Sequence, residues 1–397
     1  MNDILIRNVL LFGKKANVAI KGNRFSQIDA PADTPAKKVI EADGMAILPP
    51  FYNTHTHAAM TLLRGYADDM PLQKWLTEYI WPFEEKLTSA DIRKGSELAV
   101  REMIKSGTVF FSDMYFDIEE TIDVVQRYGM RAAIGVTFVE SHSKSQQSDK
   151  LEMLRHWVDP TGGRITLTVA PHAIYTVGPE LLKKCSNTAR ELGLKLHIHV
   201  SETRQEVDDC IRDHGTTPVR YLDSLGLLGP EVVAAHAVHV DEEEVEILAA
   251  RGVTISHCPC SNQKLASGTF PYQRVRQAGC RITLGTDGAS SNNNLDMREE
   301  MKFAALIAKG ASGDPQTMPA HEAMEIATRN GAEAFGIDAG VIADGKLADA
   351  ILIRLDDESL QPLHHLISNW VYATNSSVVD TVICDGRILM QNRQFLV

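Results

Sequence analysis

Eight short stretches rich in apolar and β-branched residues alternate with helix-length segments through the middle of this chain. The strand candidates are Ala46–Leu48 with its extension to His57, Val109–Tyr115, Arg131–Phe138, Ile165–Ala170, Lys195–Val200, Val232–Ala235, Val253–Ser256 and Arg281–Leu284. Amphipathic segments of helical length lie between most of them, namely Ser89–Ser106, Ile118–Tyr128, Pro179–Leu192, Thr203–Asp213 and Glu242–Arg251. Eight strand–helix repeats predict an α/β fold, a (β/α)₈ TIM barrel over residues 50–343.

Both ends of the chain instead resemble runs of short strands punctuated by turns. The expected strands are Ile4–Leu10, Asn17–Phe25 and Lys38–Glu41 near the start, and Ala348–Ile353, Val378–Cys384 and Arg387–Met390 near the end. Because 49 residues bury too little surface for a stable separate domain, we expect the two ends to pair. The prediction is one small β-sandwich domain made from residues 1–49 and 344–397.

Composition excludes several classes of function. A net charge of −12 argues against binding to a nucleic-acid backbone, which requires a basic face. The 6 cysteines follow no regular framework, and Cys258 and Cys260 stand one residue too close for a typical structural zinc site. No apolar run approaches membrane-spanning length, and no secretory signal pattern precedes the first strand. We expect a cytoplasmic protein that acts on a small molecule.

His55 and His57 stand one residue apart at the end of the first predicted strand. Residues i and i+2 of a strand point to the same face, so the two rings project side by side and can bind one cation. The alternative is a pair of solvent-facing loop histidines, because a single His-x-His motif is weak evidence by itself.

The ends of later strands carry further residues of the same kind. His197 and His199 repeat the spacing, and His199 is nearer to the strand's end, so we expect it to bind the cation while His197 packs or forms a hydrogen bond. Asp287 follows the eighth strand in the turn Gly-Thr-Asp-Gly. Active-site residues of such a barrel gather at the carboxyl ends of its strands. Three imidazoles and one carboxylate therefore predict a single site for zinc or ferrous iron.

A site of this kind points to hydrolysis, because a divalent cation lowers the pKa of water towards neutrality. We expect Asp287 to bind the cation and also to accept the proton of the water. His236, at the end of the sixth strand, would orient the attacking oxygen or polarise the group under attack. Glu202 is the expected proton shuttle, and the alternative is a carboxylate at a helix start. His239 and His257 are expected to be structural.

Five stretches together resemble the amidohydrolase superfamily. They are Leu48–His57, His199–Glu202, Ala234–His236, Ser256–Asn262 and Leu284–Asn292. Within the superfamily, the likeness is to the branch of deaminases and chlorohydrolases, and most of all to the methylthioadenosine/S-adenosylhomocysteine deaminases. The resemblance covers essentially the whole chain, including the split β-sandwich at its ends.

The resemblance implies a ligand set for one zinc ion per subunit: His55, His57, His199 and Asp287. It also implies that Glu202 protonates a ring nitrogen of the substrate, and that His236 and Asp287 handle the attacking water. Nothing between the strands suggests a bridging modified lysine, so a centre with two metal ions is not expected.

The resemblance also implies residues that bind the substrate. Trp81 and Glu84 lie in a segment whose glutamate contacts ribose hydroxyls, and His172 resembles a histidine that reaches the substrate. The alternative for Glu84 is the start of a solvated helix. Val136 departs from the pattern, because the thio-nucleoside deaminases commonly carry arginine there. Lys150 is a candidate to replace part of that function.

The expected reaction is hydrolytic deamination at C6 of an adenine nucleoside such as adenosine, methylthioadenosine or S-adenosylhomocysteine. The alternative is a deaminase or chlorohydrolase of another heterocycle, such as guanine, cytosine, a pterin or a triazine. A silent metal-binding or assembly protein is disfavoured, because every expected catalytic position carries a competent residue. Homo-oligomerisation, often a dimer, is an expectation from the resemblance alone.

Overall fold

The computed structural model describes residues 1–396 and contains two β-sheets that share no strand. The first is an eight-stranded sheet in which neighbouring strands are parallel. Its strands are β6 (Phe51–Thr56), β7 (Thr108–Tyr115), β8 (Arg131–Phe138), β9 (Ile165–Pro171), β10 (Leu196–Val200), β11 (Val232–His236), β12 (Thr254–His257) and β13 (Arg281–Leu284). They follow one another in chain order around a nearly closed barrel, which confirms the predicted fold class.

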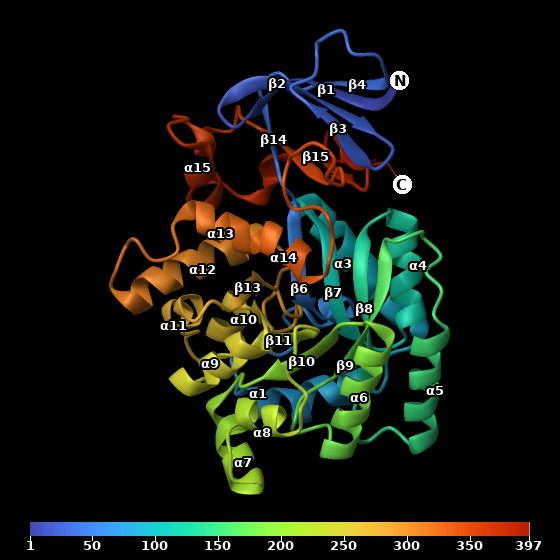
Figure 1. Ribbon diagram of the computed structural model, residues 1–397, viewed down its shortest axis with the longest axis vertical. Helices are drawn as coiled ribbons and strands as arrows, with labels where there is room; N and C mark the ends of the chain where they lie inside the picture. Colours follow the sequence, from blue (N-terminus) through green and yellow to red (C-terminus); the bar gives the residue numbers. More distant parts are fainter. Residues whose placement is uncertain (397) are drawn as a thin grey trace.

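Helices follow the barrel strands and cover the outside of the barrel (Figure 1). The segment between β6 and β7 holds η1 (Ala58–Leu63), α1 (Leu72–Trp75), the π-helix η2 (Leu76–Ile80), α2 (Trp81–Glu84) and α3 (Ser89–Ser106). Later strands are followed by α4 (Ile118–Tyr128), α5 (Lys144–His156), α6 (Pro179–Leu192), α7 (Arg204–His214), α8 (Pro218–Ser224), α9 (Glu242–Arg251), α10 (Pro259–Lys264), α11 (Tyr272–Gln277), α12 (Met297–Ser312), α13 (Ala320–Ala327) and α14 (Arg329–Ala334). No helix within residues 1–396 combines the length and apolar character needed to cross a membrane.

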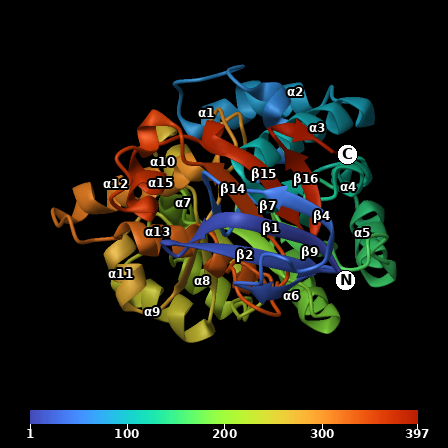
Figure 2. The ribbon, with the colours of Figure 1, turned by 90° about the horizontal axis from the view of Figure 1, so that it is seen from above.

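Both chain ends build the second sheet, which has nine strands and lies above the barrel in Figure 1. The N-terminal strands are β1 (Asn2–Leu11), β2 (Lys14–Lys21), β3 (Arg24–Ile28), β4 (Ala36–Glu41) and β5 (Met45–Leu48). From the C-terminal end come β14 (Ala350–Arg354), β15 (Val379–Cys384), β16 (Arg387–Gln391) and β17 (Gln394–Phe395), with η3 (Glu358–Leu360), α15 (Leu366–Tyr372) and η4 (Ser376–Val378) between β14 and β15. Figure 2 shows strands from both ends lying side by side in this sheet. The exact domain boundaries remain a prediction.

One expected strand is two strands in the structure. The prediction of a first barrel strand running from Ala46 to His57 was wrong, because β5 pairs with β1 and β14 in the terminal sheet. Strand β6 begins only at Phe51, after Pro49-Pro50. Proline has no N–H to donate to a ladder, so this pair of residues ends one sheet and the chain enters the other.

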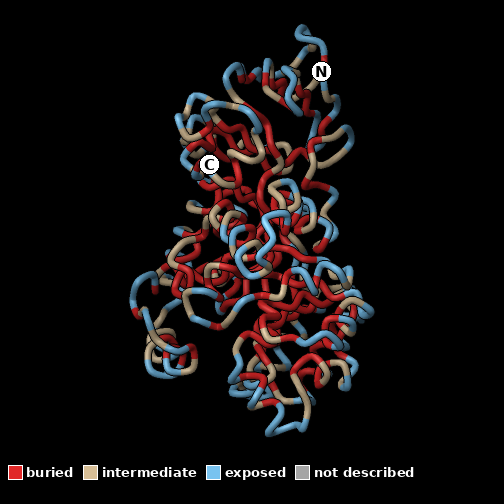
Figure 3. The backbone as a smooth tube through the Cα atoms, turned by 90° about the vertical axis from the view of Figure 1, so that its left-hand side faces the viewer, coloured by how far each residue is buried: buried red, intermediate tan, exposed pale blue. Residues whose placement is uncertain are grey.

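A buried polar network joins the two sheets. The Tyr52 hydroxyl in β6 donates a hydrogen bond to Asp349 Oδ2 at 2.7 Å. Arg131 in β8 lies 3.5 Å from Asp349 and 3.0 Å from Asp385 of the terminal sheet. Next to it, the Phe51 and Trp370 rings stack with centroids 5.9 Å apart. The buried residues form a continuous interior through the middle of the molecule (Figure 3).

Candidate metal centre and active site

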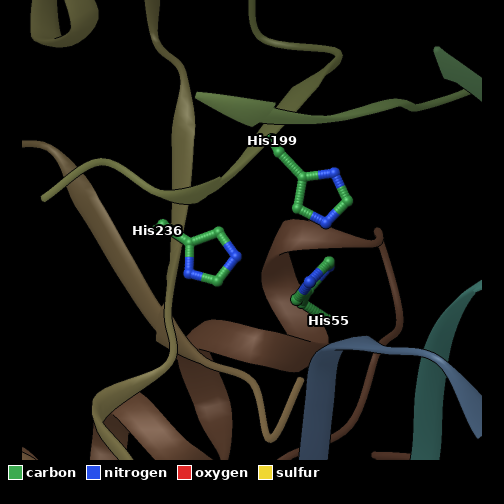
Figure 4. A group of neighbouring side chains, drawn as sticks. All are labelled: His55, His199 and His236. Carbon is green, nitrogen blue, oxygen red and sulfur yellow. The ribbon is translucent and has the colours of Figure 1, made fainter. Parts of the chain in front are cut away.

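The carboxyl ends of four barrel strands place histidine and aspartate side chains around one point. The nitrogen atoms of His55, His199 and His236 lie within 4.8 Å of one another, and the same holds for the ligand atoms of His55, His57 and Asp287. Figure 4 shows the first three rings, from β6, β10 and β11, pointing toward a common space. Four of them, His57, His199, His236 and Asp287, line a cavity of about 650 Å³.

Hydrogen bonds to backbone carbonyls orient two of the rings. His57 Nδ1 lies 2.6 Å from the Met114 oxygen, and His199 Nδ1 lies 2.7 Å from the His172 oxygen. A carbonyl only accepts, so each Nδ1 carries a proton, and in the neutral form of each ring the lone pair is on Nε2. Both rings are therefore in the tautomer that offers Nε2 to a cation.

His55 is fully buried, and its two nitrogens have different surroundings. Nδ1 lies 2.9 Å from His197 Nε2, and His197 in turn contacts Ser112 Oγ at 3.2 Å. Nε2 has no hydrogen-bond partner among the described residues. Burial lowers the pKa of His55 to about 4, so the ring is neutral near pH 7. A buried nitrogen without a partner is costly unless something else binds it.

Asp287 closes the opposite side of this group. Its Oδ1 lies 3.2 Å from His57 Nε2 and 3.4 Å from His55 Nε2. Its Oδ2 accepts hydrogen bonds from Ser261 at 2.6 Å and from Ser291 at 3.0 Å. Burial opposes ionisation, but the neighbouring histidines outweigh it and hold the pKa of Asp287 well below its usual range.

The residues present fit a divalent cation. They offer imidazole nitrogens and a carboxylate oxygen at close range, a donor set typical of zinc and of ferrous iron. The unpartnered Nε2 of His55 and the Nε2 lone pairs of His57 and His199 all belong to this group. The structure therefore contains a His/Asp group able to hold a metal ion.

His236 and Glu202 lie beside the metal ligands. His236 Nδ1 is 2.8 Å from Asn262 Oδ1, so Nδ1 donates and Nε2 keeps a lone pair. That Nε2 lies 3.9 Å from Glu202 Oε2 and 4.0 Å from Asp287 Oδ2. Burial raises the pKa of Glu202 above its ordinary value. The Nε2 lone pair of His236 and the carboxyl group of Glu202, whose pKa is raised, therefore face the same space.

Three strand-end residues have backbones in the left-handed region. The φ angles are +51° at Ser201, +72° at His236 and +60° at Asp287. Residues other than glycine adopt this conformation at a cost, and such strain is concentrated at functional sites. A further contact supports Glu202, because the buried Glu206 carboxylate accepts hydrogen bonds from the backbone N–H groups of Ser201 at 3.0 Å and Glu202 at 2.7 Å.

The expected substrate-binding residues line the same cavity. Trp81, Glu84 and His172 all contribute to its wall. The Tyr115 hydroxyl donates to Glu84 Oε1 at 2.6 Å, so Glu84 is held by a side chain from β7 and does not simply begin a solvated helix. Burial lowers the pKa of His172 to about 3, and its Nδ1 lies 2.8 Å from Thr176 Oγ1.

Two residues that the sequence singled out lie elsewhere. Val136 is buried within β8 and is not among the residues that line the cavity, whereas Thr137 and Val139 are. Lys150 also lies outside the lining, because its ammonium group donates to the Thr137 oxygen at 2.6 Å and contacts His142 Nδ1 at 3.1 Å. Neither residue is placed to contact a substrate directly.

Several supporting residues were not assigned a role from the sequence. They are Ser261, Asn262, Ser291, Glu206, Tyr115 and His142. The first three lie within the motifs that carried the family resemblance. Their place in those motifs could have indicated a supporting role beside Asp287 and His236. Tyr115 ends a predicted strand, a signal that was not used, whereas Glu206 and His142 carry no distinguishing spacing.

A model of the amidohydrolase family matches residues 46–389, and the chain therefore belongs to the amidohydrolase family. This confirms the resemblance carried by the strand-end motifs. A 5-methylthioadenosine/S-adenosylhomocysteine deaminase of Pelotomaculum thermopropionicum is 47% identical over 96% of this chain and 90% of its own length. A 5'-deoxyadenosine deaminase of Methanosphaera stadtmanae is 42% identical over 99% and 95%. The crystal structure of an adenosine deaminase from Xanthomonas campestris with bound zinc has a TM-score of 0.92 at 32% identity, covering 100% of this chain and 94% of that one.

Proposed function

We propose that this chain is a zinc-dependent hydrolase of C–N bonds that deaminates adenine nucleosides, replacing the C6 amino group with oxygen and releasing ammonia. One observation carries the proposal. Glu202 Oε2 lies 3.9 Å from His236 Nε2, next to the His/Asp group, in a cavity that Glu84 also lines. The relatives described above are named as deaminases of adenine nucleosides, which supports the substrate class.

The resident cation would be held by His55, His57, His199 and Asp287, whose donor atoms suit zinc. The adenosine deaminase of similar structure has zinc bound, which supports this choice over iron. When bound, such a cation supplies Lewis-acid activation of water near neutral pH. The chain's own residues supply the proton transfers and the orientation.

Glu202 is placed to act as the general acid. Its raised pKa lets the carboxyl group keep a proton at higher pH than an exposed glutamate, so it can protonate the ring nitrogen adjacent to C6. His236, with Nδ1 bound to Asn262, presents Nε2 as an acceptor that orients the attacking water. Asp287 is ionised and accepts the water's proton, which then passes to the departing amino group.

The remainder of the cavity wall would bind the nucleoside. Glu84 keeps a free carboxylate oxygen besides the one that Tyr115 contacts, and a carboxylate accepts hydrogen bonds from a vicinal diol well. His172 is neutral and offers its second ring nitrogen to the sugar or the base. Trp81 adds an aromatic surface at the cavity wall.

The test is ammonia release, followed together with the change in purine absorbance, from the zinc-loaded protein. Adenosine, methylthioadenosine, 5'-deoxyadenosine and S-adenosylhomocysteine are the substrates. We expect turnover of at least one, and a loss of about 100-fold or more in kcat for Glu202→Gln. No ammonia from any of the four would refute the nucleoside proposal.

Variants of two adjacent glutamates distinguish a nucleoside substrate from a free base. Glu84 and Glu85 both line the cavity, but Tyr115 binds only Glu84. For a ribose-bearing substrate, Glu84→Gln should raise KM while Glu85→Gln changes it little. Equal effects of the two variants, with turnover of guanine, cytosine, a pterin or a triazine, would favour a different heterocycle.

A further inference from the structure

The cavity wall has an unbalanced set of charges. Among the described residues that line it there is no lysine and no arginine. Asp287 is an expected ligand of the cation, and three further carboxyl groups line the wall, those of Glu84, Glu85 and Glu202. The apolar part of the wall includes Trp75, Trp81 and Phe116. A negatively charged substrate group placed away from the expected metal ligands would therefore lose its hydration without gaining a cationic side chain as partner.

The order of the barrel strands shows which part of the wall faces the end of the nucleoside beyond its base. The expected metal ligands and His236 come from β6, β10, β11 and the turn after β13, and none comes from β7, β8 or β9. Tyr115, which holds Glu84, ends β7, and His172 follows β9. Strand β8 lies between β7 and β9. The segment after β8 therefore lies between the residues that we propose to bind the nucleoside, Glu84 and His172. Its cavity-lining residues are Val139, Ser141 and His142.

Lys150 is hydrogen-bonded to this segment but is not among the residues that line the cavity. Lys150 Nζ donates to the Thr137 oxygen at 2.6 Å and lies 3.1 Å from His142 Nδ1. An ammonium group has no acceptor, so His142 Nδ1 must accept, and the ring is neutral with its proton on Nε2. Lys150 thus fixes the tautomer of His142 and leaves the cavity a neutral N–H donor in place of a cation.

We propose that this cavity selects adenine nucleosides whose 5' substituent is uncharged, such as hydrogen, hydroxyl or a short alkylthio group, and that Val139, Ser141 and His142 contact that substituent. The inference rests on the proposed deaminase function and narrows its substrate class. Nucleosides that end in a carboxylate or a phosphate are discriminated against, because this part of the wall offers them a neutral donor but no cationic side chain.

Two measurements on one panel test this selectivity. The panel is 5'-deoxyadenosine and methylthioadenosine as neutral nucleosides, and adenosine 5'-carboxylate and adenosine 5'-monophosphate as negatively charged ones. We expect kcat/KM to be at least about tenfold higher for each neutral compound than for each charged one. Dissociation constants, measured by calorimetry with the zinc-loaded Glu202→Gln variant, should show the same order. Equal or tighter binding of the charged compounds overturns the inference whether or not turnover occurs, whereas a neutral preference without turnover refutes only the proposed function.

A cation placed in the wall should reverse the preference. Ser141 is exposed and lines the cavity, so Ser141→Arg adds a guanidinium group there with room for its side chain. Ser145→Arg, on the exposed start of α5 and outside the cavity lining, adds the same charge as a matched control. Ser141→Arg should improve the affinity for adenosine 5'-carboxylate relative to methylthioadenosine at least about tenfold, and Ser145→Arg less than about twofold. An equal effect of both variants would show that overall charge, and not the cavity wall, sets the preference.

Discussion

The backbone N–H of Asp287 donates a hydrogen bond to the carbonyl oxygen of His55 at 3.0 Å. This bond links the end of β6, the first barrel strand, to the turn after β13, the last one. Strands β6 and β13 are the two end strands in the order of the eight-stranded sheet, so the barrel closes between them. The hydrogen bond at the closure of the barrel therefore also holds two of the expected metal ligands, His55 and Asp287, next to each other.

The side chain of Thr54 in β6 is hydrogen-bonded to β12 and β13 across this closure. Its hydroxyl lies 2.6 Å from Ser256 Oγ, 2.7 Å from Thr283 Oγ1 and 2.9 Å from the Leu284 oxygen, all of them buried. Thr54→Val keeps the shape but removes these three hydrogen bonds, while Thr283 Oγ1 still donates to the Ile255 oxygen at 3.0 Å. We therefore expect a loss of about 1–3 kcal/mol in the free energy of unfolding. Denaturant unfolding measures it.

Thr254→Val is the matched control for this closure. Thr254 lies in the neighbouring strand β12, is fully buried, and its hydroxyl has no hydrogen-bond partner among residues 1–396. Removing that hydroxyl should leave stability unchanged or raise it slightly. A Thr54→Val protein as stable as Thr254→Val would show that the hydroxyl of Thr54 does not hold the barrel closed.

Gly285 allows β6 and β13 to approach each other at the site. A Cβ atom there would lie 2.7 Å from His55 Cβ and 2.8 Å from the His55 oxygen, closer than packed atoms come. Gly285→Ala should therefore displace His55 and weaken zinc affinity at least about tenfold. Competition with a chromophoric chelator measures that affinity. Gly310→Ala, in α12 with open space around the new methyl group, should leave it unchanged.

Glu206 is expected to act as a positioning residue for Glu202. Both of its oxygens accept backbone N–H groups, at Ser201 and Glu202, and glutamine offers only one acceptor. Glu206→Gln should lower kcat about 10- to 100-fold with a small change in KM, because a displaced acid is less effective in the transition state. Steady-state kinetics with methylthioadenosine measure both constants.

The buried Glu244 offers a comparison for that variant. Its carboxylate accepts the backbone N–H of Asp241 at 3.0 Å, at the start of α9 and outside the cavity lining. Glu244→Gln should lower stability with little effect on kcat. The positioning role would be contradicted by equal losses of kcat in Glu206→Gln and Glu244→Gln.

Glu300 should make stability depend on pH. Burial raises its pKa to about 8, while Asn292 and the Cys260 N–H contact its oxygens at 2.6 and 3.1 Å. Between the unfolded value of 4.5 and about 8, the folded chain keeps a proton that the unfolded chain releases. This contribution is present below pH 4.5 and is lost as the pH rises, by up to about 1.4 kcal/mol per pH unit.

The Glu300→Gln variant isolates that contribution, because every other titrating group is common to both proteins. Its unfolding free energy, relative to the unsubstituted chain, should increase steadily from pH 5 to pH 8. Denaturant titrations at several pH values measure the difference. A difference that stays constant over this range would contradict the account of Glu300.

Local pattern alone was sufficient for much of the fold. Helices α3, α4, α6 and α9 begin and end at the residues that apolar periodicity and the following glycines predicted. The break at Pro49-Pro50 was readable in principle, since proline interrupts a ladder. It was missed because the apolar residues continue on both sides of it, and hydrophobic pattern does not show which sheet a strand joins.

The site was less predictable away from the strand ends. His55, His57, His199, His236 and Asp287 follow strands, so barrel geometry alone brings them together. Tyr115 ends β7 and Glu206 lies in α7, but no residue spacing encodes the hydrogen bonds by which they hold Glu84 and Glu202. Val136 was given weight for substrate choice, yet the cavity is lined at Thr137 and Val139 instead.

The central claim is that one cation, held where β6 and β13 meet, is required for deamination. Elemental analysis of the purified protein, paired with ammonia release before and after chelation, tests it most directly. The account predicts one equivalent of zinc per chain, loss of turnover when it is removed, recovery when it is restored, and no such recovery in Asp287→Ala. Undiminished turnover by protein without a stoichiometric metal ion would contradict it.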